Sequence, residues 1–160
     1  MEDCGSMTEL GTYGCFAVTK LLGTNYSNWR YTSIRDKNGV DKFTKVFFEY
    51  GDTTTGLVKA GIGAKSEGEL ILSGTNGYIL VRAPWWMPTQ IEVHYEDASK
   101  TEVYNTEFNG NGLQYELEYF VKQIQNNMPV DEETKNQSIT IASIMEEFIN
   151  SEIGYRTKVI

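Results

Sequence analysis

The sequence predicts an α+β fold, with an open, predominantly antiparallel six- to seven-stranded sheet and helices packed on one face. Residues 27–108 contain one β-strand pattern after another, separated by turns rich in glycine and asparagine. Residues 113–124 and 131–149 instead repeat apolar residues at helical spacing. Strands and helices segregated in this way along the chain are typical of α+β domains. The length of 160 residues fits one domain, residues 1–160, with a core of its own.

A helix that ends at Gly23 is the first element expected. Apolar residues recur at roughly helical spacing over residues 10–22, and Thr8 is the expected N-cap because its hydroxyl can accept a first-turn N–H. Gly23 suits the other end, since glycine adopts a positive φ without a Cβ penalty. Gly11 and Gly14 weaken a helix by up to ~1 kcal/mol each, so we expect another interaction to hold or use this turn.

Seven strand segments follow, and alternation assigns their faces. Asn38-Gly39 and Asn76-Gly77 are hairpin signals, and Pro84 and Pro88 bracket a loop. The expected strands are 28–37, 40–50, 56–64, 68–74, 78–83, 89–97 and 101–108. Val58, Ala60, Ile62, Leu70, Leu72, Ile79, Val81, Ile91, Val93 and Tyr95 define the buried face. The opposite, half-polar face carries Lys59, Gly61, Glu69, Ser73, Tyr78, Arg82, Glu92 and His94.

Two helices close the chain. The first carries an apolar stripe made of Leu113, Leu117, Phe120, Val121 and Ile124. Asp131 is expected to cap the second helix. The core face of that second helix is expected to contain Ile141, Ile144, Met145, Phe148 and Ile149.

The charge balance excludes several classes of partner. The formal net charge is −8, and it falls wholly on residues 89–160, because residues 1–88 are neutral overall. A negative protein repels both nucleic acid and anionic membranes. No apolar run approaches the ~18 residues that a membrane helix needs. We therefore expect neither nucleic acid nor a membrane as a partner.

The cysteines and the single histidine do not form a recognisable metal or nucleophile pattern. Cys4 and Cys15 lie apart from any histidine in the sequence, so neither a zinc site nor a cysteine nucleophile is indicated. We expect two reduced thiols in a cytoplasmic protein. His94 alone cannot build a multi-histidine metal site, and we expect it at a surface or interface, so no metal is predicted.

Two constellations are candidates for chemistry. Glu9 and Tyr13 are four residues apart, which places them on one face of the first helix, and a carboxylate beside a phenol can tune proton transfer. Trp85 and Trp86 are adjacent in the proline-bracketed loop, and indole rings stack on sugars or anchor protein interfaces. Ordinary structural roles remain open for both pairs: a surface Glu/Tyr pair, and a loop that folds one indole onto the sheet edge.

The order and spacing of several segments resemble the C-terminal domain of the Gfo/Idh/MocA oxidoreductases, the glucose–fructose oxidoreductase and inositol dehydrogenase family. The resemblance runs from residue 5 to about residue 153. The matching segments are Glu9-Leu10-Gly11-Thr12-Tyr13 with Lys20-Leu21-Leu22-Gly23, Gly68-Glu69-Leu70 with Gly74-Thr75-Asn76-Gly77-Tyr78-Ile79, Ala83-Pro84-Trp85-Trp86, and Phe108 to Ile124 with Gly112-Leu113-Gln114-Tyr115-Glu116.

The resemblance implies part of an NAD(P)-dependent enzyme that moves hydride to or from a sugar or polyol. Tyr13 matches the family's proton donor or acceptor, and Glu9 stands where aspartate is usual. The family's glycine-rich dinucleotide fingerprint and Glu-Lys-Pro motif are not in this sequence. We therefore expect a catalytically incomplete substrate-binding and oligomerisation domain. It would start partway into the family domain and bind no cofactor by itself, with a Rossmann domain supplied upstream or in trans.

Two other functions stay open. A self-sufficient carbohydrate- or small-ligand-binding module would use Trp85 and Trp86 for its substrate. A pure assembly domain would form a homo-oligomer through its exposed sheet face, whose apolar members are Leu57, Ile71, Tyr78 and Leu80.

Overall fold

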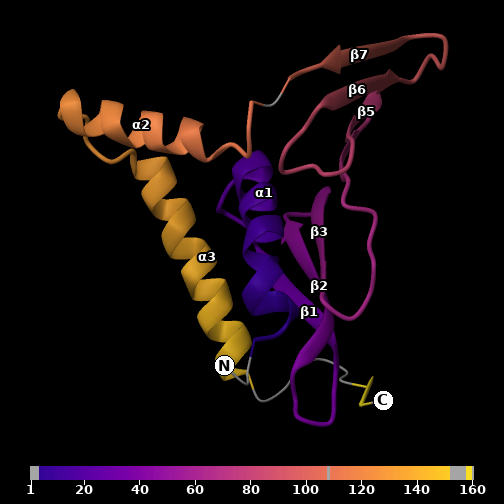
Figure 1. Ribbon diagram of the computed structural model, residues 1–160. Helices are drawn as coiled ribbons and strands as arrows, with labels where there is room; N and C mark the ends of the chain where they lie inside the picture. Colours follow the sequence, from indigo (N-terminus) through magenta and orange to yellow (C-terminus); the bar gives the residue numbers. More distant parts are fainter. Residues whose placement is uncertain (1–3, 108, 152–157, 160) are drawn as a thin grey trace. The chain divides into compact units, whose positions relative to one another are not determined.

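The computed structural model describes residues 4–107, 109–151 and 158–159, with the elements shown in Figure 1. They form two compact units, one of residues 67–129 and one of residues 1–66 with 130–160. The elements are η1 (Met7–Gly11), α1 (Thr12–Leu22), β1 (Asn28–Arg35), β2 (Asp41–Tyr50), β3 (Thr54–Gly61), β4 (Leu70–Gly74), β5 (Gly77–Val81), β6 (Gln90–Tyr95), β7 (Thr101–Asn105), α2 (Leu113–Gln125), α3 (Glu132–Asn150) and β8 (Lys158–Val159). The α+β class is confirmed, whereas the expectation of one domain over residues 1–160 stays a prediction.

The seven expected strands are present, and hydrogen bonds group them in two open sheets. The first has the order β3-β2-β1-β8 and the second the order β4-β5-β6-β7. All pairs are antiparallel except β1 with β8. The amides of Ile62 and Gly63 both donate to the carbonyl oxygen of Lys42, at 3.1 and 2.9 Å. This double contact lies at the end of the β2–β3 ladder.

Three cross-strand rows form the inner face of the first sheet. They are Trp29–Phe48–Gly56, Tyr31–Val46–Val58 and Ser33–Thr44–Ala60. Helices α1 and α3 cover this face (Figure 1), and together they contribute Cys15, Ile144 and Phe148 to the buried core, while η1 contributes Met7. The unit that carries the first helix therefore has the expected arrangement of helices on one sheet face.

Two glycines let α1 lie unusually close to β3. A Cβ on Gly14 would lie 2.3 Å from Cγ1 of Val58, and a Cβ on Gly56 would lie 2.7 Å from Cγ1 of Val18. The sequence analysis expected another interaction to hold or use this turn. At Gly14 that interaction is the close packing of the helix backbone against Val58, for which a side chain would leave no space.

The ends of the first helix are only partly as expected. Gly23 ends α1 at φ 90°, and its N–H donates to the carbonyl oxygen of Thr19, as the sequence indicates. Thr8 is not the N-cap, because the helix begins earlier with the π-helical turn η1. Its hydroxyl lies inside that turn and exchanges hydrogen bonds with the backbone of Gly5.

Several apolar side chains lie elsewhere than alternation suggests. In the first helix Leu10, Phe16 and Leu21 are exposed, and so are Ile62 and Ile149 from the predicted buried faces. Ile144 and Phe148 are buried as expected, and Ile141 and Met145 pack against the same core. In α2 the apolar stripe is present, but none of its described side chains is buried.

Candidate functional site

Glu9 and Tyr13 lie on the first helical segment, and both side chains are exposed. Tyr13 is 60% exposed, which leaves its phenol accessible to a ligand. Within the described residues, no hydrogen bond or ion pair joins either side chain to another group. Glu9 belongs to the π-helical turn η1, while Tyr13 belongs to α1. π-Helical turns are rare in proteins, and those that do occur are often found at functional sites. The predicted pair is therefore accessible on one helical segment, and its joint role stays a prediction.

A buried carboxylate holds the start of this segment. Asp41 is 4% exposed, and its Oδ2 accepts the N–H of Met7 at 2.8 Å and the hydroxyl of Thr44 at 2.7 Å. The Ser6 hydroxyl donates to the Asp41 carbonyl oxygen at 3.0 Å and accepts the N–H of Ile62, also at 3.0 Å. The sequence interpretation missed Asp41. The available signal was an aspartate opening a strand, a position where aspartate is depleted.

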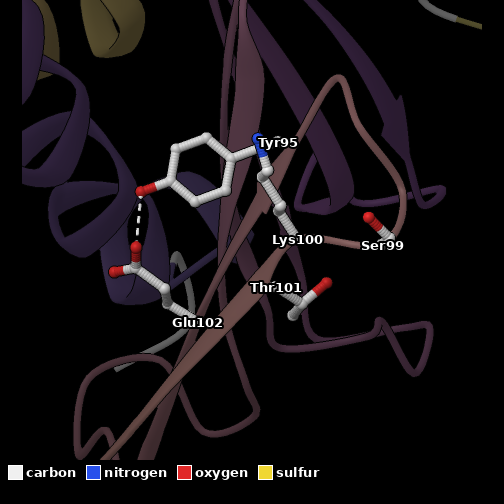
Figure 2. Close-up of a pocket in the computed structure, with 5 residues that line it drawn as sticks. All are labelled: Tyr95, Ser99, Lys100, Thr101 and Glu102. Atoms are coloured by element: carbon white, nitrogen blue, oxygen red, sulfur yellow. Dashed lines mark hydrogen bonds between the residues drawn. The ribbon is translucent and has the colours of Figure 1, made fainter.

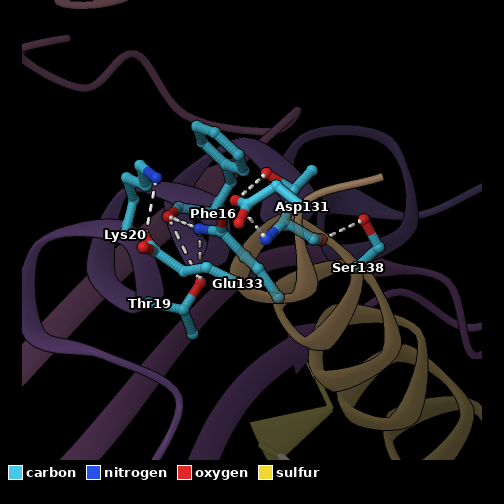
Figure 3. A network of polar contacts seen from close by, with 8 residues as sticks. Phe16, Thr19, Lys20, Asp131, Glu133 and Ser138 are labelled. Atoms are coloured by element: carbon cyan, nitrogen blue, oxygen red, sulfur yellow. Dashed lines mark hydrogen bonds and ion pairs between the residues drawn. The ribbon is translucent and has the colours of Figure 1, made fainter. Parts of the chain in front are cut away.

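Helix α3 holds α1 from the other side, through the polar contacts in Figure 3. Nε2 of Gln137, which is 4% exposed, donates to the carbonyl oxygen of Phe16 at 3.0 Å and to the hydroxyl of Thr19 at 3.1 Å. Nζ of Lys20 pairs with Glu133 at 2.8 Å on the surface. The helix that carries Tyr13 is therefore fixed by a sheet on one side and by α3 on the other.

The Trp85-Trp86 loop belongs to the unit of residues 67–129. The two indole rings meet edge to face, with centroids 6.1 Å apart. Trp85 is half-buried and its main-chain N–H donates to the carbonyl oxygen of Gly68, whereas Trp86 is 57% exposed. The loop thus presents one indole to solvent. The role of these indoles in substrate binding stays a prediction.

The half-polar face predicted on the later strands is a connected network. Arg82 Nε donates to Glu92 Oε1 at 2.6 Å, and His94 Nε2 lies 2.7 Å from Glu92 Oε2. The Tyr78 ring stacks on His94 at 4.5 Å. The hydrogen bond from Arg82, and to a smaller extent the one from His94, hold the pKa of Glu92 below its ordinary value. Leu80, expected among the exposed apolar residues of this sheet, is instead 8% exposed.

A shallow hollow lies at the hairpin between β6 and β7 (Figure 2). Its volume is about 450 Å³, and Tyr95 donates to Glu102 across it at 2.8 Å. Tyr104 also donates to Glu102. The two hydrogen bonds lower the pKa of the Glu102 carboxyl, and the one from Tyr104 has the larger effect. The lining residues are Tyr95, Ser99, Lys100, Thr101 and Glu102, which include none of the four predicted site residues.

The starts of η1, α2 and α3 do not fit a dinucleotide pyrophosphate. A pyrophosphate is bound by unpaired N–H groups at a helix N-terminus. The Asp41 carboxylate accepts a hydrogen bond from the Met7 N–H at the start of η1, and the Asp131 carboxylate accepts one from the Thr134 N–H at the start of α3. Glu116 lies in the first turn of α2. The starts of η1, α2 and α3 thus each carry a carboxylate that would repel phosphate.

The described residues carry neither a cluster of metal ligands nor a membrane-crossing helix. They contain no group of three or more His, Cys, Asp or Glu side chains that could hold a metal ion. No helix in this part of the chain is both long and apolar enough to cross a membrane.

Solved structures of oxidoreductases share the fold. The chain superposes on a 3-ketoreductase from Actinomadura kijaniata in complex with TDP-benzene and NADP with a TM-score of 0.78 and 12% identity, covering 98% of this chain and 49% of that one. For UDP-N-acetylglucosamine 3-dehydrogenase from Acidithiobacillus ferrooxidans the TM-score is 0.75 at 12% identity, covering 94% of this chain and 48% of that one. The chain has the fold of about half of each enzyme.

Sequence comparisons add no closer relative. No protein-family model matches the chain, and no curated protein matches it. At 12% identity the likeness to the two enzymes shows the fold alone. The chain spans about half of their length, so their activities and ligands bear on this chain only as a proposal.

Proposed function

We propose that the chain is the substrate-binding part of an NAD(P)-dependent oxidoreductase acting on a sugar, a polyol or a sugar nucleotide. The observation that carries the proposal is the accessible phenol of Tyr13, on an anchored helix, at the motif position of the family that the sequence resembles. The fold supports it, because two enzymes of similar fold are a 3-ketoreductase and a UDP-N-acetylglucosamine 3-dehydrogenase.

In this proposal Tyr13 exchanges a proton with the substrate hydroxyl or carbonyl oxygen. A phenol with no partner among the described residues has its hydroxyl available to a ligand. Glu9, one turn earlier, provides a negative charge that orients the phenol or the substrate. The exposed indole of Trp86, with Trp85 beside it, gives a flat apolar surface of the kind that sugar rings stack on.

The cofactor belongs to a separate domain, supplied upstream or in trans. The carboxylates at the three helix starts support this division, since they oppose a pyrophosphate. The chain is therefore proposed to bind substrate and to be inactive in hydride transfer by itself.

Binding to the purified chain tests the proposal. UDP-N-acetylglucosamine is titrated while the ring signals of 13C-labelled tyrosine are followed by NMR. The Tyr13 signal is identified by its absence in Tyr13→Phe. We expect this signal to shift as the sugar nucleotide is added, and the tryptophan fluorescence to change. The matched control is Tyr119→Phe, which removes another exposed tyrosine, on α2. No shift across a panel of sugars, polyols and sugar nucleotides would contradict the proposal, as would micromolar NADPH binding with hydride transfer by the chain alone.

A role in self-association is the second candidate. Ile71, Tyr78 and Val103 are 60, 42 and 49% exposed on one face of the second sheet, around the Arg82–Glu92 pair. Exposed apolar side chains rimmed by polar ones are typical of interfaces. Light scattering at ~0.1 mM is the test, because an interface of standard size persists there and a monomeric mass would exclude it.

A further inference from the structure

We propose that Asp41 is a positioning residue for the Glu9–Tyr13 segment. Its buried carboxylate fixes the π-helical turn η1 against the first sheet and thereby sets where the Tyr13 phenol is presented. This inference rests on the proposed function of Tyr13. The hydrogen bonds of Asp41 themselves do not depend on that function.

The Asp41 carboxylate reaches the start of η1 from a strand that is distant in the sequence. Asp41 lies 34 positions from Met7 in the sequence, yet its Oδ2 accepts the Met7 N–H at 2.8 Å. First-turn N–H groups lack partners within the helix, and the positive end of the helix dipole attracts a carboxylate. Asp41 thus does from a distant strand what an N-cap residue ordinarily does locally.

Burial of the Asp41 side chain carries a desolvation cost. A carboxylate with 4% exposure is expensive to desolvate unless it is hydrogen-bonded, and two donors reach the same oxygen here. The neighbouring inward-facing positions of β2 carry Thr44 and Val46, which a strand can bury at lower cost. An ionisable residue here is explained by the helix start that it binds.

Close packing transmits this position toward Tyr13. A Cβ on Gly5 would lie 1.7 Å from Asp41 Oδ1, so the segment before η1 lies directly against the carboxylate. Met7 is fully buried, and a Cβ on Gly11 would lie 2.4 Å from its sulfur. The series Asp41, Met7, Gly11 therefore runs in contact to within two residues of Tyr13.

Three variants separate this role from general stability. Asp41→Ala removes both hydrogen bonds to Oδ2. Asp41→Asn keeps an oxygen acceptor but removes the charge. Thr44→Val is the matched control, because it removes the other donor to the same oxygen and leaves the Met7 contact in place.

The measurements are amide hydrogen exchange of residues 7–11 and the affinity for UDP-N-acetylglucosamine, read at the Tyr13 ring, in the full chain. We expect Asp41→Ala to accelerate exchange in η1 at least ~10-fold relative to β2 amides and to weaken the affinity ~10-fold. Asp41→Asn is expected to accelerate exchange by a smaller factor, about 3-fold, and to restore most of the affinity. Thr44→Val is expected to leave η1 exchange, relative to β2, and affinity within ~2-fold of the unsubstituted chain.

The outcomes decide between positioning and mere stability. Equal acceleration in η1 by Thr44→Val and Asp41→Ala would overturn the proposal, and so would unchanged η1 exchange in Asp41→Ala. If Asp41→Ala does not fold, the comparison of Asp41→Asn with Thr44→Val decides, and η1 exchange unchanged in Asp41→Asn overturns the proposal. If the unsubstituted chain binds no sugar nucleotide, the proposed function loses that support, while the exchange comparison still tests whether Asp41 holds the turn.

Discussion

Gln137 on α3 donates a hydrogen bond of 3.0 Å to the main-chain carbonyl oxygen of Phe16 on α1. The same amide nitrogen lies 3.1 Å from the hydroxyl of Thr19, which itself donates to the carbonyl oxygen of Cys15 at 2.8 Å. One buried glutamine side chain thus joins α3 to residues of α1 that lie more than a hundred positions away in the sequence.

Replacing Gln137 by leucine is expected to destabilise the fold. The carbonyl oxygen of Phe16 and the Thr19 hydroxyl would lose a buried donor, at a cost of ~1–3 kcal/mol in the free energy of unfolding. Urea denaturation measures this. Ser138→Ala is the control, because Ser138 is exposed and its hydroxyl donates to the Thr134 carbonyl oxygen within the same helix. Equal unfolding midpoints for Gln137→Leu and Ser138→Ala would contradict the assigned role.

The contact between α1 and β3 leads to a second prediction. Gly14→Ala would raise intrinsic helix propensity by ~1 kcal/mol, yet its Cβ would lie 2.3 Å from Cγ1 of Val58. We expect net destabilisation of ~1–3 kcal/mol, since overpacking outweighs propensity. Thermal unfolding is the measurement. The double variant Gly14→Ala/Val58→Ala should be less destabilised than the sum of the two single losses, because the smaller side chain at position 58 leaves space for the new Cβ. A loss equal to that sum would argue against the contact.

The Arg82–Glu92–His94 network predicts acid sensitivity of the fold. Because the pKa of Glu92 is lowered in the folded chain, mainly by the hydrogen bond from Arg82, its contribution to stability is present above its unfolded pKa. The unfolded pKa of a glutamate is ~4.3. The contribution of Glu92 to stability is therefore lost as the pH falls from that value through the lower pKa of the folded chain. Glu92→Gln should lower the thermal midpoint at pH 7 and flatten its fall toward pH 3.

The control for this pH series is Glu118→Gln on α2. Glu118 pairs with Lys122 at 2.6 Å on an exposed helix surface, where ion pairs contribute little. Its midpoint should follow that of the unsubstituted chain at each pH. An acid limb in Glu92→Gln as steep as in the unsubstituted chain would show that other carboxylates dominate.

The two cysteines are expected to differ in reactivity. Burial raises the pKa of the Cys15 thiol to about 12, whereas Cys4 is exposed. A disulfide reagent such as Ellman's should modify Cys4 first and Cys15 on the order of 100-fold more slowly, because the thiolate is the reactive form. In denaturant both should react together. Two equally fast thiols in the native chain would mean that the core opens around Cys15.

Local chemistry made parts of the fold predictable from sequence. Gly23 at a helix end, Asn38-Gly39 between two strand patterns and Asp131 before a polar first turn each act through their own neighbours. The structure has Gly23 at φ 90°, the β1–β2 hairpin, and Asp131 accepting the N–H of Thr134 at 3.1 Å. Such signals need no knowledge of the rest of the chain.

Features set by distant residues were not predictable in this way. Thr8 has the right hydroxyl for an N-cap, but the start of the helix is held by Asp41, which comes from β2. The buried face of the first helix likewise depends on the sheet, so Cys15 and Thr19 are inside while Phe16 and Leu21 are exposed. In the candidate site, sequence could nominate Glu9 and Tyr13, and only the folded chain reveals what holds them.

The order of the elements also bears on biosynthesis. Residues 67–129 lie in the sequence between the two stretches that form the other unit. On a ribosome, β1, β2 and β3 emerge before α3, whose Ile144 and Phe148 complete their core. At ordinary translation speed that interval is on the order of seconds. Throughout it the part of the sheet face that α3 covers stays exposed on the nascent chain, with only η1 and α1 packed on the rest, and we expect chaperones to bind that exposed apolar surface.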